Sequence, residues 1–322
     1  MNLLFRVSTA STITNLRPAT TSSRLFRSFS SGIMSSTAAP PSSSKPAKNT
    51  NKPAAKPAPA KRELKILMLH GYTQSGPLFK NKTGALNKLL NKTLSPPPYN
   101  YTVSLVYPTG PHNLRPADIP GYQPPEGGDA EVDDGAPSDN WGWFRREDAT
   151  GKYRGFGEGM HRIAETIREA GGVDGVLGFS QGGAQAALVA AALESERRSL
   201  PEALAGEDSW ASALRAANGG RALRFCIVYS GFVARDEELQ WLNEGGMATP
   251  SLHFLGGLDT VVDETRSRGL VEACGPEGQD GGKAKVLVHP GGHYVPVSKE
   301  WTMPVVGFLR EVLAEEESKE AL

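Results

Sequence analysis

A serine stands between two glycines at residues 178–182, where the sequence reads Gly-Phe-Ser-Gln-Gly. This spacing fits the G-x-S-x-G pattern, in which a nucleophilic serine occupies a sharp turn between a strand and a helix. The flanking positions need glycine, because a Cβ atom at Gly178 or Gly182 would crowd the backbone of such a turn. The pattern indicates Ser180 as a nucleophile. It also indicates the backbone N–H of Gln181, at the start of the following helix, as a donor to an oxyanion.

Ser180 would need a base, because a serine hydroxyl is a weak nucleophile at neutral pH. A histidine supplies the base in this chemistry, and a carboxylate orients the histidine. Among the histidines, His289 and His293 follow the last expected strand. We favour His293, because the glycine pair just before it allows its loop to reach back over the serine. His289 is the alternative.

Asp259 is the expected orienting carboxylate. It follows the expected strand 251–255 and a Gly-Gly-Leu turn, so it falls at the carboxyl end of a strand. Asp263 is the main alternative, although an aspartate just before the helix that begins near Glu264 is well placed to cap that helix. Asp236, six residues beyond another expected strand, is a weaker candidate.

Two further segments are expected to border Ser180. The sequence His70-Gly71-Tyr72 closes the first expected strand, and we assign the N–H of Tyr72 as the second oxyanion donor. We expect His70 itself to form local hydrogen bonds. Aromatic residues at 141–144 and at Phe156 precede the serine turn. They are expected either to line an acyl pocket or to belong to the core.

The elements that would position these residues alternate between strands and helices. The expected strands are residues 64–69, 101–107, 173–179, 224–230, 251–255 and 284–289. The expected helices are residues 78–90, 158–170, 181–194, 264–273 and 298–317. Short strands that are apolar on both faces are typical of a buried parallel sheet. The order therefore predicts an α/β fold with a doubly wound, mostly parallel sheet and helices on both faces.

Two long segments interrupt this alternation. Residues 117–140 are acidic and rich in glycine and proline, and residues 195–220 are expected to form a helical insertion. Both are long enough to overhang a site at the carboxyl ends of the strands, where doubly wound sheets bind ligands. Residues 64–322 show no internal repeat and are expected to form one domain.

Several of these motifs resemble those of a known family. They are Leu-His-Gly-Tyr-Thr-Gln-Ser-Gly at 69–76, Lys-Thr-Gly-Ala-Leu at 82–86, Asp-Gly-Val-Leu-Gly-Phe-Ser-Gln-Gly at 174–182, Ser-Gly-Phe at 230–232, Gly-Leu-Asp-Thr-Val-Val at 257–262 and His-Pro-Gly-Gly-His-Tyr-Val-Pro at 289–296. Over residues 64–310 the chain resembles the FSH-type serine hydrolases, a family similar to the ovarian tumour-suppressor-associated esterase of animals. The chain departs from that pattern at Gly183, where alanine is usual, at Asp263, where proline often stands, and in its two long segments.

The resemblance implies an α/β-hydrolase fold and a carboxylesterase or thioesterase. It also implies that Ser180, Asp259 and His293 form a catalytic triad. The expected reaction is hydrolysis of a small-molecule ester through an acyl-enzyme, without a cofactor or metal. One alternative is an acyl thioesterase that acts on CoA or carrier-protein thioesters. The other is an inactive binding module on the same fold.

Charge and composition exclude other classes of protein. Residues 1–62 contain ten Lys or Arg and no Asp or Glu, so residues 63–322 keep 25 basic and 35 acidic residues, a net charge of −10. An acidic domain argues against general nucleic-acid binding. No apolar run approaches the roughly 18 residues of a membrane span. Cys226 and Cys274 lack the spacing of a zinc site or a disulfide framework.

The basic amino end has the composition of a targeting segment. Residues 1–33 are rich in Arg, Ser and Thr and lack acids, which is typical of a mitochondrial transit peptide, and the context suggests cleavage after Phe29. A second start at Met34 would give a cytoplasmic form. Residues 34–63 are mainly Pro, Ala, Ser and Lys, and we expect them to form a disordered linker.

Overall fold

The computed structural model describes residues 60–115, 118–119, 139–147, 149–275 and 283–320. The expected transit peptide (1–33) and nearly all of the expected linker (34–63) lie outside these residues. β1 begins at Arg62, two residues before the expected strand and inside the range expected as linker. The extra pairing arises because the Arg62 N–H donates to the carbonyl of Asn100, which extends the contact with β2.

A six-stranded parallel sheet forms the centre of the fold. Its order is β10-β9-β8-β7-β1-β2, and every neighbouring pair runs parallel. The strands are β1 (Arg62–Leu69), β2 (Tyr101–Val106), β7 (Gly175–Phe179), β8 (Phe225–Tyr229), β9 (Ser251–Gly256) and β10 (Ala284–His289). The strand order reverses between β1 and β7, because the chain first adds β2 on one side and later adds β8 to β10 on the other. Such a reversal opens a crevice at the carboxyl ends of the strands.

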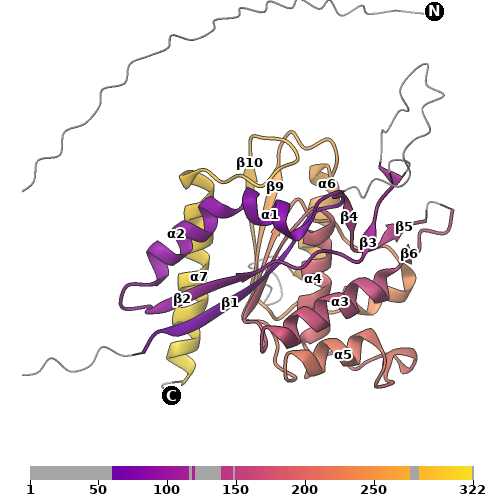
Figure 1. Ribbon diagram of the computed structural model, residues 1–322, viewed down its shortest axis with the longest axis horizontal. Helices are drawn as coiled ribbons and strands as arrows, with labels where there is room; N and C mark the ends of the chain where they lie inside the picture. Colours follow the sequence, from indigo (N-terminus) through magenta and orange to yellow (C-terminus); the bar gives the residue numbers. More distant parts are fainter. Residues whose placement is uncertain (1–59, 116–117, 120–138, 148, 276–282, 321–322) are drawn as a thin grey trace, which may run out of the picture. The chain divides into compact units, whose positions relative to one another are not determined.

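Helices cover both faces of this sheet (Figure 1). One face carries α1 (Gly76–Lys82), α2 (Gly84–Leu94) and α7 (Lys299–Glu320), whose apolar residues form one core cluster with the sheet. The other face carries α3 (Phe156–Glu169), α4 (Gln181–Leu193), α5 (Trp210–Ala217) and α6 (Glu264–Cys274), which form a second cluster. The predicted doubly wound parallel sheet with helices on both faces is confirmed.

The single helix expected at residues 78–90 is wrong, because the structure has two helices there. α1 begins after Ser75, whose hydroxyl accepts from the N–H of Leu78, and ends at Lys82. Thr83 leaves helical geometry at φ −102° and ψ 10°. Its buried hydroxyl donates to the Phe79 carbonyl and contacts the Tyr107 hydroxyl, each at 2.8 Å. These side-chain bonds fix the break between α1 and α2.

Residues 195–220 are helical in part, with a 3-10 turn at Glu202–Leu204 followed by α5. The segment leaves α4 at its carboxyl end and returns to β8 at its amino end, and α5 packs on α3. None of these residues lines the cavity beside Ser180. The expectation that this segment overhangs the site is therefore wrong. The segment begins and ends near the amino ends of the strands, whereas Ser180 follows the carboxyl end of β7.

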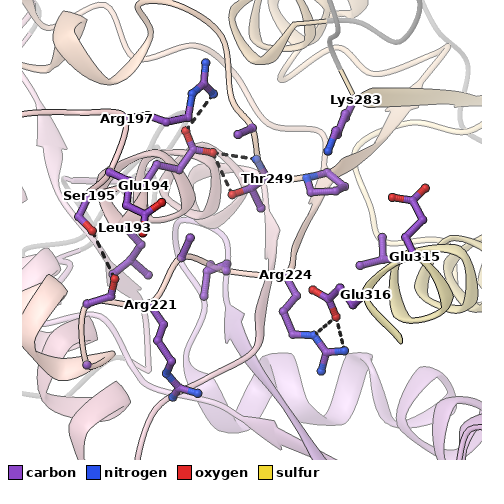
Figure 2. Close-up of a pocket in the computed structure, with 18 residues that line it drawn as sticks. Leu193, Glu194, Ser195, Arg197, Arg221, Arg224, Thr249, Lys283, Glu315 and Glu316 are labelled. Atoms are coloured by element: carbon purple, nitrogen blue, oxygen red, sulfur yellow. Dashed lines mark hydrogen bonds and ion pairs between the residues drawn. The ribbon is translucent and has the colours of Figure 1, made fainter. Parts of the chain in front are cut away.

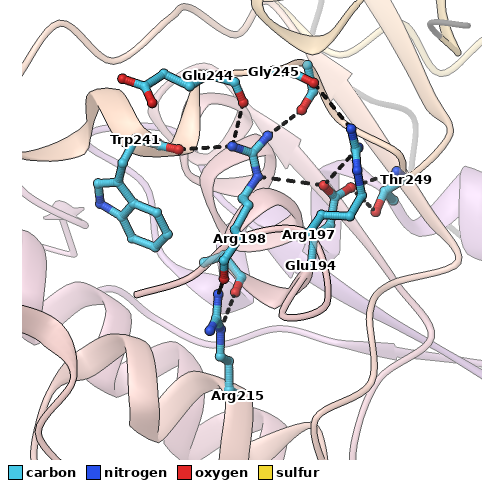
Figure 3. A network of polar contacts seen from close by, with 10 residues as sticks. Glu194, Arg197, Arg198, Arg215, Trp241, Glu244, Gly245 and Thr249 are labelled. Atoms are coloured by element: carbon cyan, nitrogen blue, oxygen red, sulfur yellow. Dashed lines mark hydrogen bonds and ion pairs between the residues drawn. The ribbon is translucent and has the colours of Figure 1, made fainter. Parts of the chain in front are cut away.

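A buried polar network lies near the amino ends of the strands (Figure 3). The guanidinium of Arg198 donates to the carbonyls of Trp241 and Glu244 at 2.9 and 2.6 Å and lies 3.6 Å from the Glu194 carboxylate. Glu194 also accepts from the N–H and hydroxyl of Thr249 at 2.8 and 2.9 Å. The network ties the end of α4 to the segment that enters β9.

A cavity of about 550 Å³ lies beside this network. Figure 2 shows Arg224 and Glu316 facing each other in it, with an Arg224 Nε to Glu316 Oε2 distance of 2.5 Å. Its walls come from the amino ends of β8, β9 and β10, whereas Ser180 follows the carboxyl end of β7. Two ion pairs, Arg197 with Glu194 and Arg224 with Glu316, join charged residues that line this cavity.

Candidate active site

Ser180 occupies the turn between β7 and α4. Its backbone has φ 55° and ψ −119°, a conformation that non-glycine residues rarely adopt, and its N–H donates to the Tyr229 carbonyl at 2.8 Å. A Cβ atom on Gly178 would collide with the carbonyl of Gly182, and one on Gly182 would collide with the carbonyl of Leu69. The predicted strand, turn and helix around Ser180 are therefore present, and both glycines are required by contact.

Ser180, His293 and Asp259 lie in one hydrogen-bonded chain. The Ser180 Oγ is 2.9 Å from His293 Nε2, and His293 Nδ1 is 2.7 Å from Asp259 Oδ2. The other oxygen of Asp259 accepts from the N–H groups of Val261 and Val262, each at 2.9 Å. The structure thus brings together residues predicted from three separate motifs.

The charge of Asp259 fixes the tautomer of His293. Burial alone would raise the pKa of Asp259, but hydrogen bonds from His293 and from the N–H of Val262 outweigh it, so the pKa lies below its usual value. An ionised carboxylate can only accept hydrogen bonds. His293 Nδ1 therefore carries the proton that it donates to Asp259. Its Nε2 is left as an acceptor for the Ser180 hydroxyl.

The alternative residues have structural roles. Asp263 caps α6 by accepting from the N–H of Arg266 at 3.0 Å. Asp236 caps the 3-10 turn Glu237–Leu242 and accepts from the N–H of Tyr153 at 2.6 Å. The ring of His289 is buried, and its Nδ1 accepts from the N–H of Gly291 at 3.2 Å. None of the three has a hydrogen bond to Ser180 or His293 among those formed by the described residues.

The expected oxyanion donors flank the crevice between β1 and β7. Tyr72 follows the end of β1, and Gln181 begins α4 directly after Ser180. The side chain of Gln181 is fixed, since it accepts from the N–H of Trp143 and donates to the carbonyl of Phe144, both at 2.8 Å. Sequence patterns did not indicate this side-chain role. It holds the segment 141–144 against the start of α4.

His70 is buried and forms local hydrogen bonds, as expected. Its Nε2 accepts from the N–H of Gly110 at 2.9 Å, and its Nδ1 lies 2.8 Å from the carbonyl of Gly71. Burial lowers the pKa of His70 to about 4, so the ring is neutral at physiological pH. A neutral ring can accept and donate at once, and it thereby fixes the turn that precedes Tyr72.

A family model described as "Serine hydrolase (FSH1)" matches residues 60–305 of this chain. The chain belongs to the FSH1 serine hydrolase family. The resemblance that the motifs indicated is confirmed. The predicted α/β-hydrolase fold, with its parallel sheet and serine turn, is present, and the protein is a hydrolase of the esterase type.

Three curated relatives illustrate the similarity. "Family of serine hydrolases 3" of Saccharomyces cerevisiae is 33% identical over 256 residues, covering 78% of this chain and 85% of that protein. "Esterase OVCA2" of Danio rerio is 31% identical over 260 residues, covering 77% of this chain and 96% of that protein. A "Dihydrofolate reductase" of Schizosaccharomyces pombe is 30% identical over 258 residues, covering 80% of this chain. The match covers 49% of that last protein, so this FSH1-family chain spans about half of its length.

A cavity of about 490 Å³ opens beside Ser180 in this FSH1-family enzyme. It is lined by residues Tyr72, Asp118, Phe144, Arg146, Tyr153, Ser180, Gln181, Phe232, Val233, Arg235, Val261, Val262 and Arg266. The two roles considered for the aromatic cluster are both present, because Phe144 lines the cavity while Trp143 and Phe156 are buried in the core. Of the acidic segment 117–140, Asp118 contributes to the wall, and residues 120–138 lie outside the described residues.

The three arginines in this wall were not indicated by any sequence motif. One ends a short strand, one follows a strand and one belongs to a helix, so only the folded chain brings them to one cavity. No set of three or more His, Cys, Asp or Glu in the described part of the chain is arranged to hold a metal ion. Among the described helices, none combines the length and apolar character of a membrane span.

Proposed function

We propose that this hydrolase cleaves carboxylic esters through an acyl-enzyme formed on Ser180. The observation that carries the proposal is the chain of hydrogen bonds from Asp259 through His293 to Ser180 at the turn between β7 and α4. The hydrogen bond from His293 Nδ1 to Asp259 supports this role, because it leaves Nε2 to accept from the Ser180 hydroxyl.

In this mechanism Ser180 Oγ attacks the ester carbonyl carbon while its proton passes to His293 Nε2, 2.9 Å away. Asp259 stabilises the resulting imidazolium. The N–H groups of Gln181 and Tyr72 donate to the oxyanion, each lowering the barrier by about 3 kcal/mol. His293 then protonates the departing alkoxide, which leaves as the alcohol. Deacylation repeats the sequence, with water attacking the acyl carbon and giving its proton to His293, and Ser180 is regenerated.

Substitution of Ser180 tests the proposal. The Ser180→Ala protein should fold, fail to react with a fluorophosphonate probe and lose ester turnover by several orders of magnitude. Ser195→Ala is a matched control, because that hydroxyl donates to the Gly220 carbonyl at the opposite edge of the sheet. The control protein should react with the probe and hydrolyse esters at the wild-type rate. Undiminished labelling of Ser180→Ala would contradict the mechanism, and an unlabelled wild-type protein would favour the inactive binding module.

Thioester hydrolysis uses the same groups and is the other reaction that this arrangement supports. The thioester differs in its leaving group, a thiolate that needs less assistance from the imidazolium. Comparison of turnover for one acyl chain as an ester and as a thioester decides between the two. A higher kcat/KM for the thioester would assign the enzyme as a thioesterase.

A further inference from the structure

Three arginines line the cavity beside Ser180, each from a different part of the fold. Arg146 ends the short strand β5 (Arg145–Arg146), Arg235 follows β8, and Arg266 is in the first turn of α6. All three side chains are exposed, so their charges lie at the solvent side of the cavity. This clustering contrasts with residues 63–322 as a whole, which have a net charge of −10.

The charges of Arg235 and Arg266 are not neutralised by an ion pair within the described residues. Asp118 is the one carboxylate among the lining residues, and it lies 3.5 Å from Arg115 Nε and 3.3 Å from Arg145 Nη2, neither of which lines the cavity. Within the described ranges, no carboxylate is within ion-pair distance of Arg235 or Arg266. Among the described lining residues, arginines therefore outnumber carboxylates, which favours an anionic ligand.

Arg266 is held in place without losing its charge. Its Nη1 donates to the carbonyl of Val261 at 2.8 Å, and its guanidinium lies 5.1 Å from the ring centre of Phe232. A cation that stacks on an aromatic face keeps free N–H groups for a ligand. Val261 lies two residues after Asp259 in the loop that follows β9, so this contact also links the arginine to the loop of the candidate triad.

The remaining walls of the cavity are largely apolar. Phe144 stacks on Tyr153 with ring centres 4.2 Å apart, and Phe232, Val233 and Val262 complete this part of the lining. A ligand that fits such a site has an apolar portion against these rings and a negative group near the arginines.

We propose that the cavity selects esters or thioesters that carry an anionic group, a carboxylate or a phosphate, joined by an apolar portion to the scissile carbonyl. This inference rests on the proposed reaction at Ser180. The anion can belong to the acyl chain, as in a half-ester of a dicarboxylic acid. It can also belong to the leaving group, as in a thiol that bears phosphates. In both cases the arginines attract the substrate and orient it with its apolar portion along the aromatic wall.

Two pairs of substrates test the proposal and distinguish the source of the anion. For the acyl side, p-nitrophenyl hexanoate is compared with the mono-p-nitrophenyl ester of adipic acid, which adds one carboxylate to the same chain length. For the leaving-group side, hexanoyl-pantetheine is compared with hexanoyl-4′-phosphopantetheine, which adds one phosphate. We expect the anionic member of at least one pair to have a kcat/KM at least about tenfold higher at low salt. The advantage should shrink as NaCl rises to about 0.5 M, because exposed charges are screened.

Arginine variants assign any preference to the cavity. Arg235→Gln and Arg266→Gln should each reduce the ratio of anionic to neutral kcat/KM about threefold to tenfold, and Arg235→Lys should retain most of it. Arg268→Gln is the matched control on the same helix, since Arg268 pairs with Glu264 and does not line the cavity. Its ratio should equal that of the wild type.

Equal kcat/KM within both pairs, or a preference that survives the Arg235→Gln, Arg266→Gln double variant, would overturn the proposal. Failure of the underlying reaction gives a different result. In that case neither neutral nor anionic substrates are hydrolysed, and the wild-type protein does not react with the fluorophosphonate probe.

Discussion

Ser180 shares its unusual backbone with two other residues at the edge of the sheet. Thr73, Ser180 and Ser230, which follow β1, β7 and β8, have φ values of 63°, 55° and 47°. Such conformations cost about 1–3 kcal/mol for a non-glycine residue and persist only where surrounding contacts impose them. Here the N–H of Ser180 donates to the Tyr229 carbonyl and that of Ser230 to the Phe254 carbonyl, both at 2.8 Å. The strained turns at Ser180 and Ser230 are therefore each fixed by the neighbouring strand.

Asp259 and Asp263 are four residues apart, and their substitution should give opposite results. Asp259→Asn removes the charge that sets the tautomer of His293, so kcat should fall about 10⁴-fold with little loss of stability. Asp263→Asn weakens the cap of α6, so the free energy of unfolding should fall by up to about 1 kcal/mol while kcat changes little. Measurement of kcat and of the thermal midpoint for both variants checks this. A catalytically inactive Asp263→Asn with an active Asp259→Asn would reverse the assignment.

Gly182 has no space for a side chain. In Gly182→Ala the new methyl group would meet the carbonyl oxygens of Leu69 and His70 at the end of β1. We expect the free energy of unfolding to fall by at least about 2 kcal/mol, as in other overpacked sites, and Ser180 to lose its reaction with the fluorophosphonate probe. Gly307→Ala, in the exposed part of α7 where nothing would meet the methyl group, is the control. It should raise stability by about 0.5–1 kcal/mol. A Gly182→Ala protein as stable as the wild type would contradict the collision.

The sequence predicted the strands better than the segments that connect them. The expected strand 284–289 agrees with β10 at both ends, because a Gly-Gly pair precedes it closely and Pro-Gly-Gly follows it directly. The prediction of one helix at 78–90 missed the break at Thr83. The Thr83 hydroxyl contacts Tyr107, which is 24 residues away and leaves no local sequence pattern. The length of residues 195–220 is compatible with a position over the site, but it does not show at which end of the strands the segment lies. The arginines of the cavity were missed for a related reason, since each is ordinary in its own segment.

His253 in the middle of β9 should make stability depend on pH. Burial lowers its pKa to about 4 from the model-compound value of 6.5, so below pH 6.5 the unfolded chain takes up a proton that the folded chain does not. Stability should then fall by about 2 kcal/mol between pH 7 and pH 5 from this residue alone. Thermal midpoints at both pH values check the slope. His253→Gln should flatten it, although His70, with a pKa also about 4, contributes its own share.

The control for that slope is a destabilising change without a titrating group. Ile227→Val in the neighbouring strand β8 should lower stability by about 1 kcal/mol equally at both pH values. If His253→Gln and the wild type lose the same stability between pH 7 and pH 5, His253 is not the source of the dependence.

We propose that residues 1–33 direct the protein to mitochondria and are removed after Phe29. The acid-free, arginine-rich composition supports this proposal. A fluorescent reporter fused to residues 1–40 should enter mitochondria, and the imported full-length protein should begin at Ser30. A protein that starts at Met34 should remain in the cytosol. A reporter that stays diffuse in the cytosol would contradict the targeting role.

The hydrogen bond between Ser180 and His293 joins residues 113 positions apart, and His293 precedes only the last helix. Contacts of such long sequence separation form late, because the entropy of closing the intervening chain is lost before the contact can form. A nascent chain that has already folded β1, β7, β8 and α4 would hold Ser180 in its turn but would lack His293. Reaction of Ser180 with a fluorophosphonate should therefore appear only after β10 has joined the sheet and His293 has reached Ser180.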